Sequence, residues 1–154
     1  MSQTYELLAG AEMADFEDKM CMTFSKCYIG MSAKQVQFLF ELRNQIKLYH
    51  WQTGMYSRHM ATDKYLTSLD EHIDLFVEVY MGKYGRPKMT SATNTTTLRN
   101  FTEKNATIYV KSALQHIQGP FSKTLNPQKD TDLLNIRDEI MGDLNQLAYL
   151  FTLR

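Results

Sequence analysis

Apolar residues recur every three or four positions in four separate segments of the chain, which is the spacing of an α-helix with one buried face. The spacing predicts helices over about residues 32–52, 57–83, 103–121 and 130–154. No segment alternates between apolar and polar residues as a half-buried strand does, so we expect essentially no sheet. The positions expected to face the core are Val36, Leu39, Leu42, Ile46, Tyr49, Leu66, Leu69, Ile73, Phe76, Val77, Tyr80, Ile108, Leu114, Ile117, Phe121, Leu133, Ile136, Ile140, Leu144, Leu147 and Phe151.

The breaks between these segments carry boundary signals. Residues 32–35 read Ser-Ala-Lys-Gln, a capping-box pattern at a helix start. Gly119-Pro120 is expected to kink or end the third helix, because proline lacks an amide donor and clashes with the preceding turn. Residues 86–103 are rich in Thr, Ser and Asn and predict a long crossover that lets the third helix run parallel to the second. The sequence therefore predicts an all-α, ferritin-like four-helix bundle over residues 32–154, with residues 1–31 as an N-terminal arm or an extra short helix.

The length of 154 residues is that of one domain, and 17 basic side chains balance 17 acidic ones. A neutral chain supplies no general positive field for nucleic acid or an anionic membrane. No apolar run approaches the length of a membrane span, and the first residues lack the basic and apolar regions of a secretory signal. Cys21 and Cys27 do not match C-x-x-C spacing, so we expect reduced thiols and a cytoplasmic protein.

Histidine and carboxylate side chains gather between residues 50 and 78. His59 and Asp63 are four residues apart, and so are Asp74 and Glu78, so each pair projects from one face of the second predicted helix. Both pairs fall on one stripe beside the core face, but they lie about 16 Å apart along the helix and cannot share one ion. Antiparallel pairing of two copies about a two-fold axis would join the first pair of one chain to the second pair of the other. His50 could close each of these sites.

These motifs have a counterpart in a known family. The sequence reads H-W-Q at residues 50–52, H-x3-D from His59 and D-x3-E from Asp74. It resembles the H-W-N, H-x3-[DE] and D-x3-E motifs of the Dps miniferritins, with the same spacing between the second and third motifs. The resemblance is specific over about residues 42–85 and architectural over residues 86–154. The stretch between the two histidines is shorter than is usual in that family, so the start of the second helix must be built differently.

The resemblance implies a ferroxidase that oxidises Fe(II) with hydrogen peroxide or dioxygen and stores ferric mineral inside a homo-oligomeric, twelve-subunit shell. Iron is then the expected metal, and zinc would bind and compete. The implied sites lie between subunits, with one group of ligands from one subunit and a second group from its partner. The first group is His50, His59 and Asp63, and the second is Asp74 and Glu78. The family's name implies DNA binding, which the zero net charge and an acidic segment over residues 1–31 argue against.

An alternative function is that of a structural or particle component, built on the same bundle with a vestigial or zinc-occupied metal site. Two neighbouring residues, Asp70 and Trp51, also leave alternatives open. Asp70 lies on the same stripe and is either an acceptor for a ligand histidine or a simple surface acid. Trp51 either packs or donates electrons beside the iron. His72 is expected at the surface.

Overall fold

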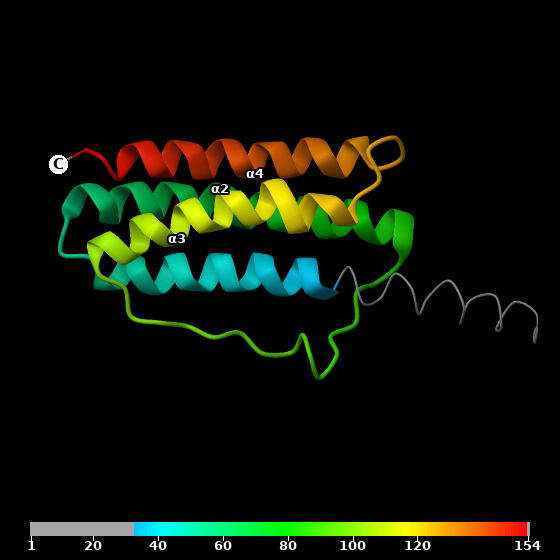
Figure 1. The fold of residues 1–154 in the computed structure, drawn as a ribbon, viewed down its shortest axis with the longest axis horizontal. Coiled ribbons are helices and arrows are strands. Elements are labelled where there is room, and N and C mark those ends of the chain that lie inside the picture. The colour runs from blue at the N-terminus through cyan, green and yellow to red at the C-terminus, as the bar shows by residue number, and fades with distance from the viewer. Residues whose placement is uncertain (1–32, 154) are drawn as a thin grey trace, which may run out of the picture.

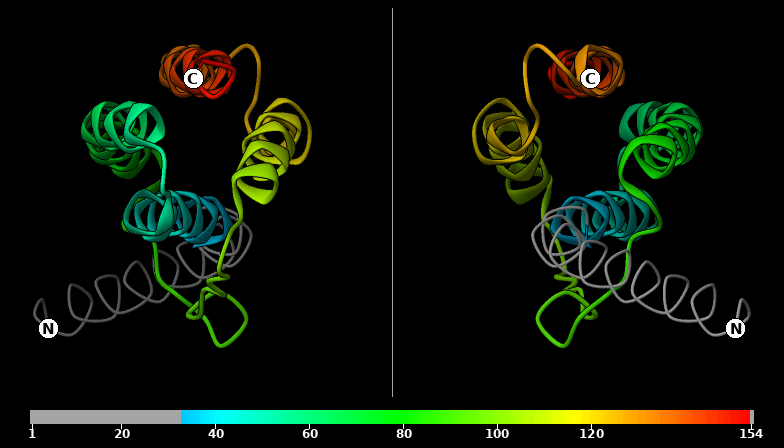
Figure 2. Two further views of the ribbon diagram at one scale, coloured as in Figure 1. Left: turned by 90° about the vertical axis from the view of Figure 1, so that its left-hand side faces the viewer. Right: turned by 90° about the vertical axis from the view of Figure 1, so that its right-hand side faces the viewer.

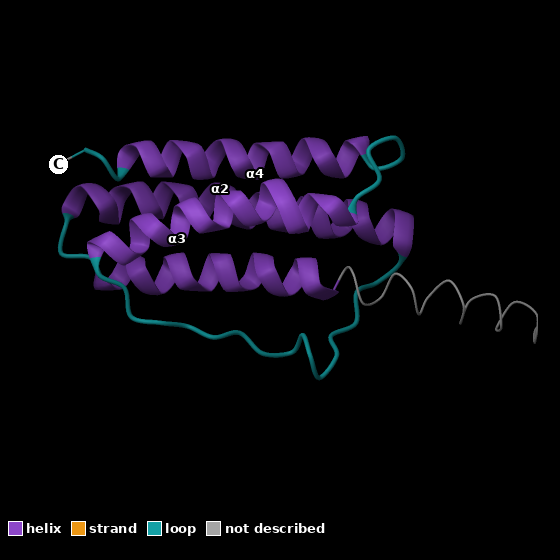
Figure 3. Cartoon of the chain, viewed as in Figure 1, coloured by secondary structure: helices purple, strands orange, loops and turns teal. Residues whose placement is uncertain are grey.

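The computed structural model describes residues 33–153, which form four long helices (Figure 1). The elements are a first helix over residues 33–52, α2 (Tyr56–Tyr84), α3 (Glu103–His116) with a π-helical turn (Ile117–Phe121) and a 3-10 turn (Ser122–Thr124), and α4 (Thr131–Leu150). Helices and loops account for all of this part of the chain, which contains no strand (Figure 3). The prediction of an all-helical bundle is confirmed, whereas the ferritin-like assignment stays a prediction. The proposed N-terminal arm, Cys21 and Cys27 lie outside the described residues.

The four helices lie side by side, and their directions do not simply alternate along the chain. Helix 33–52 and α2 are antiparallel neighbours joined by a short turn (Figure 1). The connection over residues 85–102 returns along the length of the bundle, so α3 runs in the same direction as α2 and α4 runs against both. The end-on views place α4 against α2 and α3, with helix 33–52 on the other side of the bundle (Figure 2).

The core is built from the apolar stripes that the spacing predicts. All predicted positions of helix 33–52 and α4 are buried, and so are those of α2 apart from the half-buried Val77. The prediction for α3 is wrong at Ile108, which is 52% exposed. The buried stripe of α3 instead begins at Ala106 and continues through Val110 and Ala113, and Ile108 lies about 200° away from that stripe on the helix.

Local chemistry explains where α3 begins and ends. The Thr102 hydroxyl accepts a hydrogen bond from the Asn105 amide at 3.2 Å and caps the first turn. Regular α-helix stops at His116, and the chain widens into a π-helical turn that contains Pro120. The expected break at Gly119-Pro120 is therefore confirmed. Ser32 of the predicted capping box lies outside the described residues, and the Gln35 amide donates to Thr124.

Glutamine side chains fix the long connection to helix 33–52. Gln45, which is buried, donates to the Arg99 carbonyl at 2.7 Å and accepts from the Arg99 amide at 2.9 Å. Gln52 accepts from the Phe101 amide at 3.2 Å, and Gln37 donates to the Thr95 carbonyl at 2.7 Å. Four backbone groups of residues 95–101 are thus hydrogen-bonded to side chains of the neighbouring helix. None of the helices within residues 33–153 is both long enough and apolar enough to cross a membrane.

We expect Gln45→Ala to lower the free energy of unfolding by about 1–3 kcal/mol, because two hydrogen bonds to one backbone unit are lost together. Gln37→Ala is the matched control: it removes one exposed hydrogen bond, so its cost should stay below about 0.5 kcal/mol. Urea denaturation followed by circular dichroism measures both. Equal costs for the two variants would contradict a clamping role for Gln45.

Candidate metal centre

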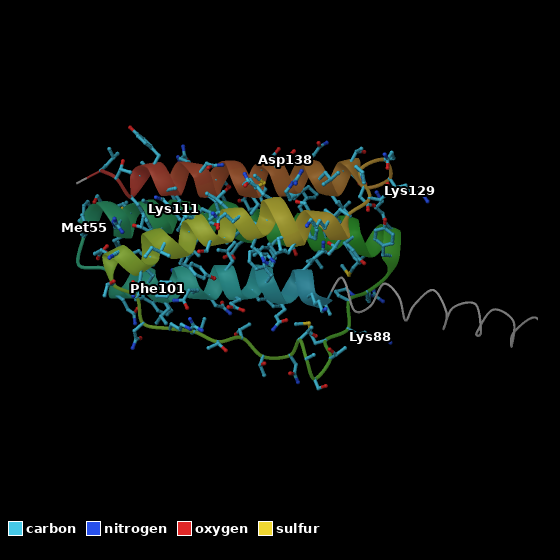
Figure 4. The ribbon with its side chains drawn as sticks, viewed as in Figure 1. Met55, Lys88, Phe101, Lys111, Lys129 and Asp138 are labelled. Carbon is cyan, nitrogen blue, oxygen red and sulfur yellow. The ribbon has the colours of Figure 1, made fainter. Side chains whose placement is uncertain are left out.

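The turn between helix 33–52 and α2 brings His50 and His59 together. Only residues 53–55 separate the helices, and α2 begins at Tyr56, one residue earlier than the sequence pattern predicts. The Thr53 hydroxyl accepts from the Met55 amide at 3.1 Å and shapes the turn. Figure 4 shows Met55 and Phe101 at the same end of the bundle, with Lys88 and Lys129 at the other. The short connection therefore places the two histidines side by side on adjacent antiparallel helices.

The two histidines bind each other's backbone reciprocally. The Nδ1 atom of His50 lies 3.1 Å from the His59 carbonyl oxygen, and the Nδ1 atom of His59 lies 3.0 Å from the His50 carbonyl oxygen. Their rings stack with centroids 3.9 Å apart and planes 22° apart. A carbonyl can only accept, so each Nδ1 carries the proton and donates it. In the neutral form of each ring, Nε2 is then the lone-pair donor, the form in which imidazole binds a metal.

The surroundings of His50 favour this neutral form. The ring is buried, and the hydroxyl oxygen of Thr62 lies 3.0 Å from its Nδ1 atom. Burial lowers the pKa of His50, and the nearby His59 and Lys47 lower it further. At neutral pH the imidazole is therefore uncharged and requires no deprotonation before it binds a cation.

Asp63 adds a carboxylate to the histidine pair. Its Oδ1 atom lies 4.0 Å from His50 Nε2, and its side chain is 61% exposed. Asp63 is also one helical turn after His59, on the same face of α2. The structure thus places His59 and Asp63 each beside His50, with His50 buried and Asp63 exposed.

The remaining two predicted ligands stand apart from this group. Asp74 and Glu78 are exposed on α2, and eleven residues separate Asp74 from Asp63, about 16 Å of helix. Across residues 33–153 of a single chain, no three His, Cys, Asp or Glu side chains are grouped so that they could hold a metal ion. One chain therefore presents two separated groups of candidate ligands along α2.

Neighbouring residues differ partly from expectation. Asp70 forms a two-point ion pair with Arg43, at 2.9 and 3.0 Å, so the structure uses it for this pair and not to orient a histidine. His72 was expected at the surface, but its side chain is only 17% exposed and lies 3.2 Å from carboxylates of Glu139 and Asp143 on α4. Trp51 does not pack in the core of the chain: it is 69% exposed, with the Lys47 ammonium 5.5 Å from its ring centroid.

The structure contains a polar network on the core side of the turn that the sequence did not predict. The buried Arg58 donates to the carbonyls of Glu103 and Phe151, each at 2.8 Å, and to the Tyr49 hydroxyl at 3.2 Å. Tyr49 and Thr53 donate to the Glu103 carboxylate, and Arg58 lies 3.3 Å from it. Burial raises the pKa of Glu103, but these hydrogen bonds and the Arg58 charge outweigh it and hold that pKa below its usual range. The only sign of this network in the sequence is Arg58 next to His59, and the burial of Arg58 becomes visible only in the structure.

Comparison with known proteins adds one result. No curated protein and no solved structure matches the chain. Residues 50–151, about two thirds of the chain, match a family described as "Family of unknown function (DUF5856)". The matched region begins at His50 and contains all five predicted ligands together with α2, α3 and α4. The chain belongs to this DUF5856 family, whose function is unknown.

Proposed function

We propose that this protein is a Dps-like miniferritin with a ferritin-like bundle, which oxidises Fe(II) at sites shared between two subunits and stores the ferric product. One observation carries the proposal: His50 and His59 each donate from Nδ1 to the other's backbone, which makes Nε2 the lone-pair atom of each neutral ring, and His50 Nε2 lies 4.0 Å from Asp63. Mixed imidazole and carboxylate ligation suits Fe(II). Within residues 33–153, the buried His50 ring directs no protein hydrogen bond from Nε2, and the Asp63 carboxylate beside this atom is exposed.

The ring geometry favours two ions at each site. The rings are stacked with centroids 3.9 Å apart and planes 22° apart, and each Nε2 lone pair lies in the plane of its own ring, so the two lone pairs lie in separate, nearly parallel planes. Lone pairs that do not converge cannot both reach one ion at the usual metal–nitrogen distance of about 2 Å. Each histidine would therefore hold its own Fe(II), and carboxylates would bridge or complete the two coordination shells.

A second copy supplies the missing carboxylates in this proposal. Asp74 and Glu78 are exposed, and no cation within residues 33–153 is paired with either of them. An antiparallel α2 from a second subunit, related by a two-fold axis, would bring them onto the histidine pair and create two equivalent sites. Large apolar side chains are also exposed on helix 33–52 and on α2, among them Phe40 on the first and Leu75 on the second. Such side chains favour burial between subunits.

The reaction balances with hydrogen peroxide as oxidant. Two Fe(II) ions each give up one electron, the O–O bond breaks, and two protons complete two water molecules. The carboxylates of Asp63, Asp74 and Glu78 would stabilise the higher charge of the Fe(III) product. The protein contributes ligand positions and an enclosed volume for the mineral, while the iron supplies the redox chemistry.

Fe(II) oxidation followed by ferric absorbance tests the proposed activity. We expect the protein to accelerate oxidation by peroxide or dioxygen over buffer, and Zn(II) added first to slow it by occupying the same ligands. Size-exclusion chromatography with light scattering is expected to give a dimer or a multiple of it. Oxidation no faster than in buffer would reject the ferroxidase and leave the zinc-filled structural component as the better proposal. A monomer would reject the shared site.

A further inference from the structure

The backbones that carry the two histidines are held together from the opposite, core-facing side. His50 follows Tyr49, and His59 follows Arg58, so each ligand has a neighbour about 100° around its helix that points into the bundle. Tyr49 and Arg58 are buried, and both bind Glu103 at the first position of α3. One carboxylate of α3 therefore contacts both histidine-bearing helices.

Glu103 also holds the turn between those helices. Thr53 donates to its carboxylate at 2.7 Å, and the same hydroxyl accepts from the Met55 amide. The carboxylate is thus bonded before, within and after the turn, through Tyr49, Thr53 and Arg58. These three contacts therefore join the two backbones at the end of the bundle where the histidines lie.

The separation of the two backbones determines the tautomer and the orientation of the two imidazole rings. Each Nδ1 hydrogen bond, at 3.0 and 3.1 Å, ends on a carbonyl of the facing helix. A relative shift of the two backbones by about 1 Å would break both bonds, because hydrogen bonds weaken steeply beyond about 3.5 Å. Either ring could then turn or change tautomer, and its Nε2 would no longer be a fixed lone-pair donor.

We infer that Glu103, with Arg58, is a positioning residue that locks His50 and His59 as Nδ1-protonated, metal-ready ligands. The inference rests on the proposed function for its consequence, which is metal binding, but the locked imidazole pair is a property of the metal-free protein. Glu103 contacts neither the imidazoles nor the open surface beside Asp63. It acts through the two backbones and couples the start of α3 to the site.

The experiment compares ¹⁵N-edited spectra of the histidine rings in metal-free full-length protein and Co(II) binding by visible absorption. Wild type is expected to show both rings as the Nδ1–H tautomer. Glu103→Ala should lose that signature in at least one of the two rings and bind Co(II) about 10–100-fold more weakly, the usual loss for a group that orients a ligand. Glu103→Gln keeps one acceptor oxygen for Tyr49 or Thr53, and its amide group can donate to the other hydroxyl oxygen, so it should lose less affinity than Glu103→Ala.

Asp130→Asn is the matched control, because Asp130 accepts from the Tyr84 hydroxyl and pairs with Lys83 at 3.3 Å at the opposite end of α2. It should lose stability but keep the histidine signature and Co(II) affinity. If Glu103→Ala behaves like this control, the inference is overturned. If Glu103→Ala does not fold, Thr53→Val must give a smaller change of the same kind, and no change there overturns it equally. Failure of wild type itself to bind Co(II) would instead count against the proposed function.

Discussion

Replacing both Asp74 and Glu78 with alanine is expected to slow Fe(II) oxidation by more than about 100-fold. Groups that only orient a metal ligand are commonly worth 10–100-fold, so removal of two ligands should exceed that range. Both side chains are exposed and four residues apart on α2, where their like charges repel. The free energy of unfolding should therefore change by less than about 0.5 kcal/mol. Stopped-flow absorbance measures the rate, and urea denaturation measures the stability.

Asp132→Ala/Asp138→Ala on α4 is the control for this variant. It removes the same charge from exposed positions, one near Lys83 and one beside Arg137, without touching the proposed site. Iron oxidation by the control should stay close to that of wild type. Similar rates for wild type, control and the Asp74→Ala/Glu78→Ala variant would mean that these two carboxylates are not ligands.

Arg58→Met is expected to cause the largest loss of stability among the polar side chains, about 2–4 kcal/mol. Removal of one partner of a buried charged network leaves the others without bonds, and such losses commonly reach 3–5 kcal/mol. The partial exposure of Glu103 reduces the expected cost. The substitution also removes the guanidinium that lies 4.5 Å from the Phe151 ring centroid and ties α2 to the end of α4. Unfolding in guanidinium chloride measures the loss in the free energy of unfolding.

Arg43→Met provides the comparison, because Arg43 also binds a carboxylate at two points but is 35% exposed. Exposed ion pairs contribute little, so its loss should stay below about 1 kcal/mol. A cost for Arg58→Met as small as that for Arg43→Met would show that the polar network does not hold this end of the bundle.

The helical spacing of apolar residues was sufficient to predict the four helices and most of their buried faces. It failed at Ile108, because α3 presents a stripe of small residues to the core, and alanines carry a weaker apolar signal than isoleucine. The glutamine contacts to residues 95–101 could not be predicted, since an amide side chain gives no sign of which backbone it will meet.

The candidate site was predictable as a set of residue types and only partly as a geometry. Spacing indicated that His59 and Asp63 share a face of α2 and that Asp74 lies too far along it to join them. The reciprocal bonds between His50 and His59 depend on how two helices meet across a three-residue turn, which spacing within one helix does not contain. The Glu103 network depends on α3, more than 40 residues away in sequence.

Completion of each proposed site by two subunits is tested most directly by subunit mixing. His50→Ala/His59→Ala and Asp74→Ala/Glu78→Ala chains should each be inactive alone. In a mixed dimer, one of the two sites combines intact histidines from one chain with intact carboxylates from the other. Co-refolding equal amounts of the two variants should therefore restore about a quarter of the wild-type rate of Fe(II) oxidation, since half of the dimers are mixed. A mixture as inactive as its two components, with mixed dimers verified by mass spectrometry, would contradict the shared site.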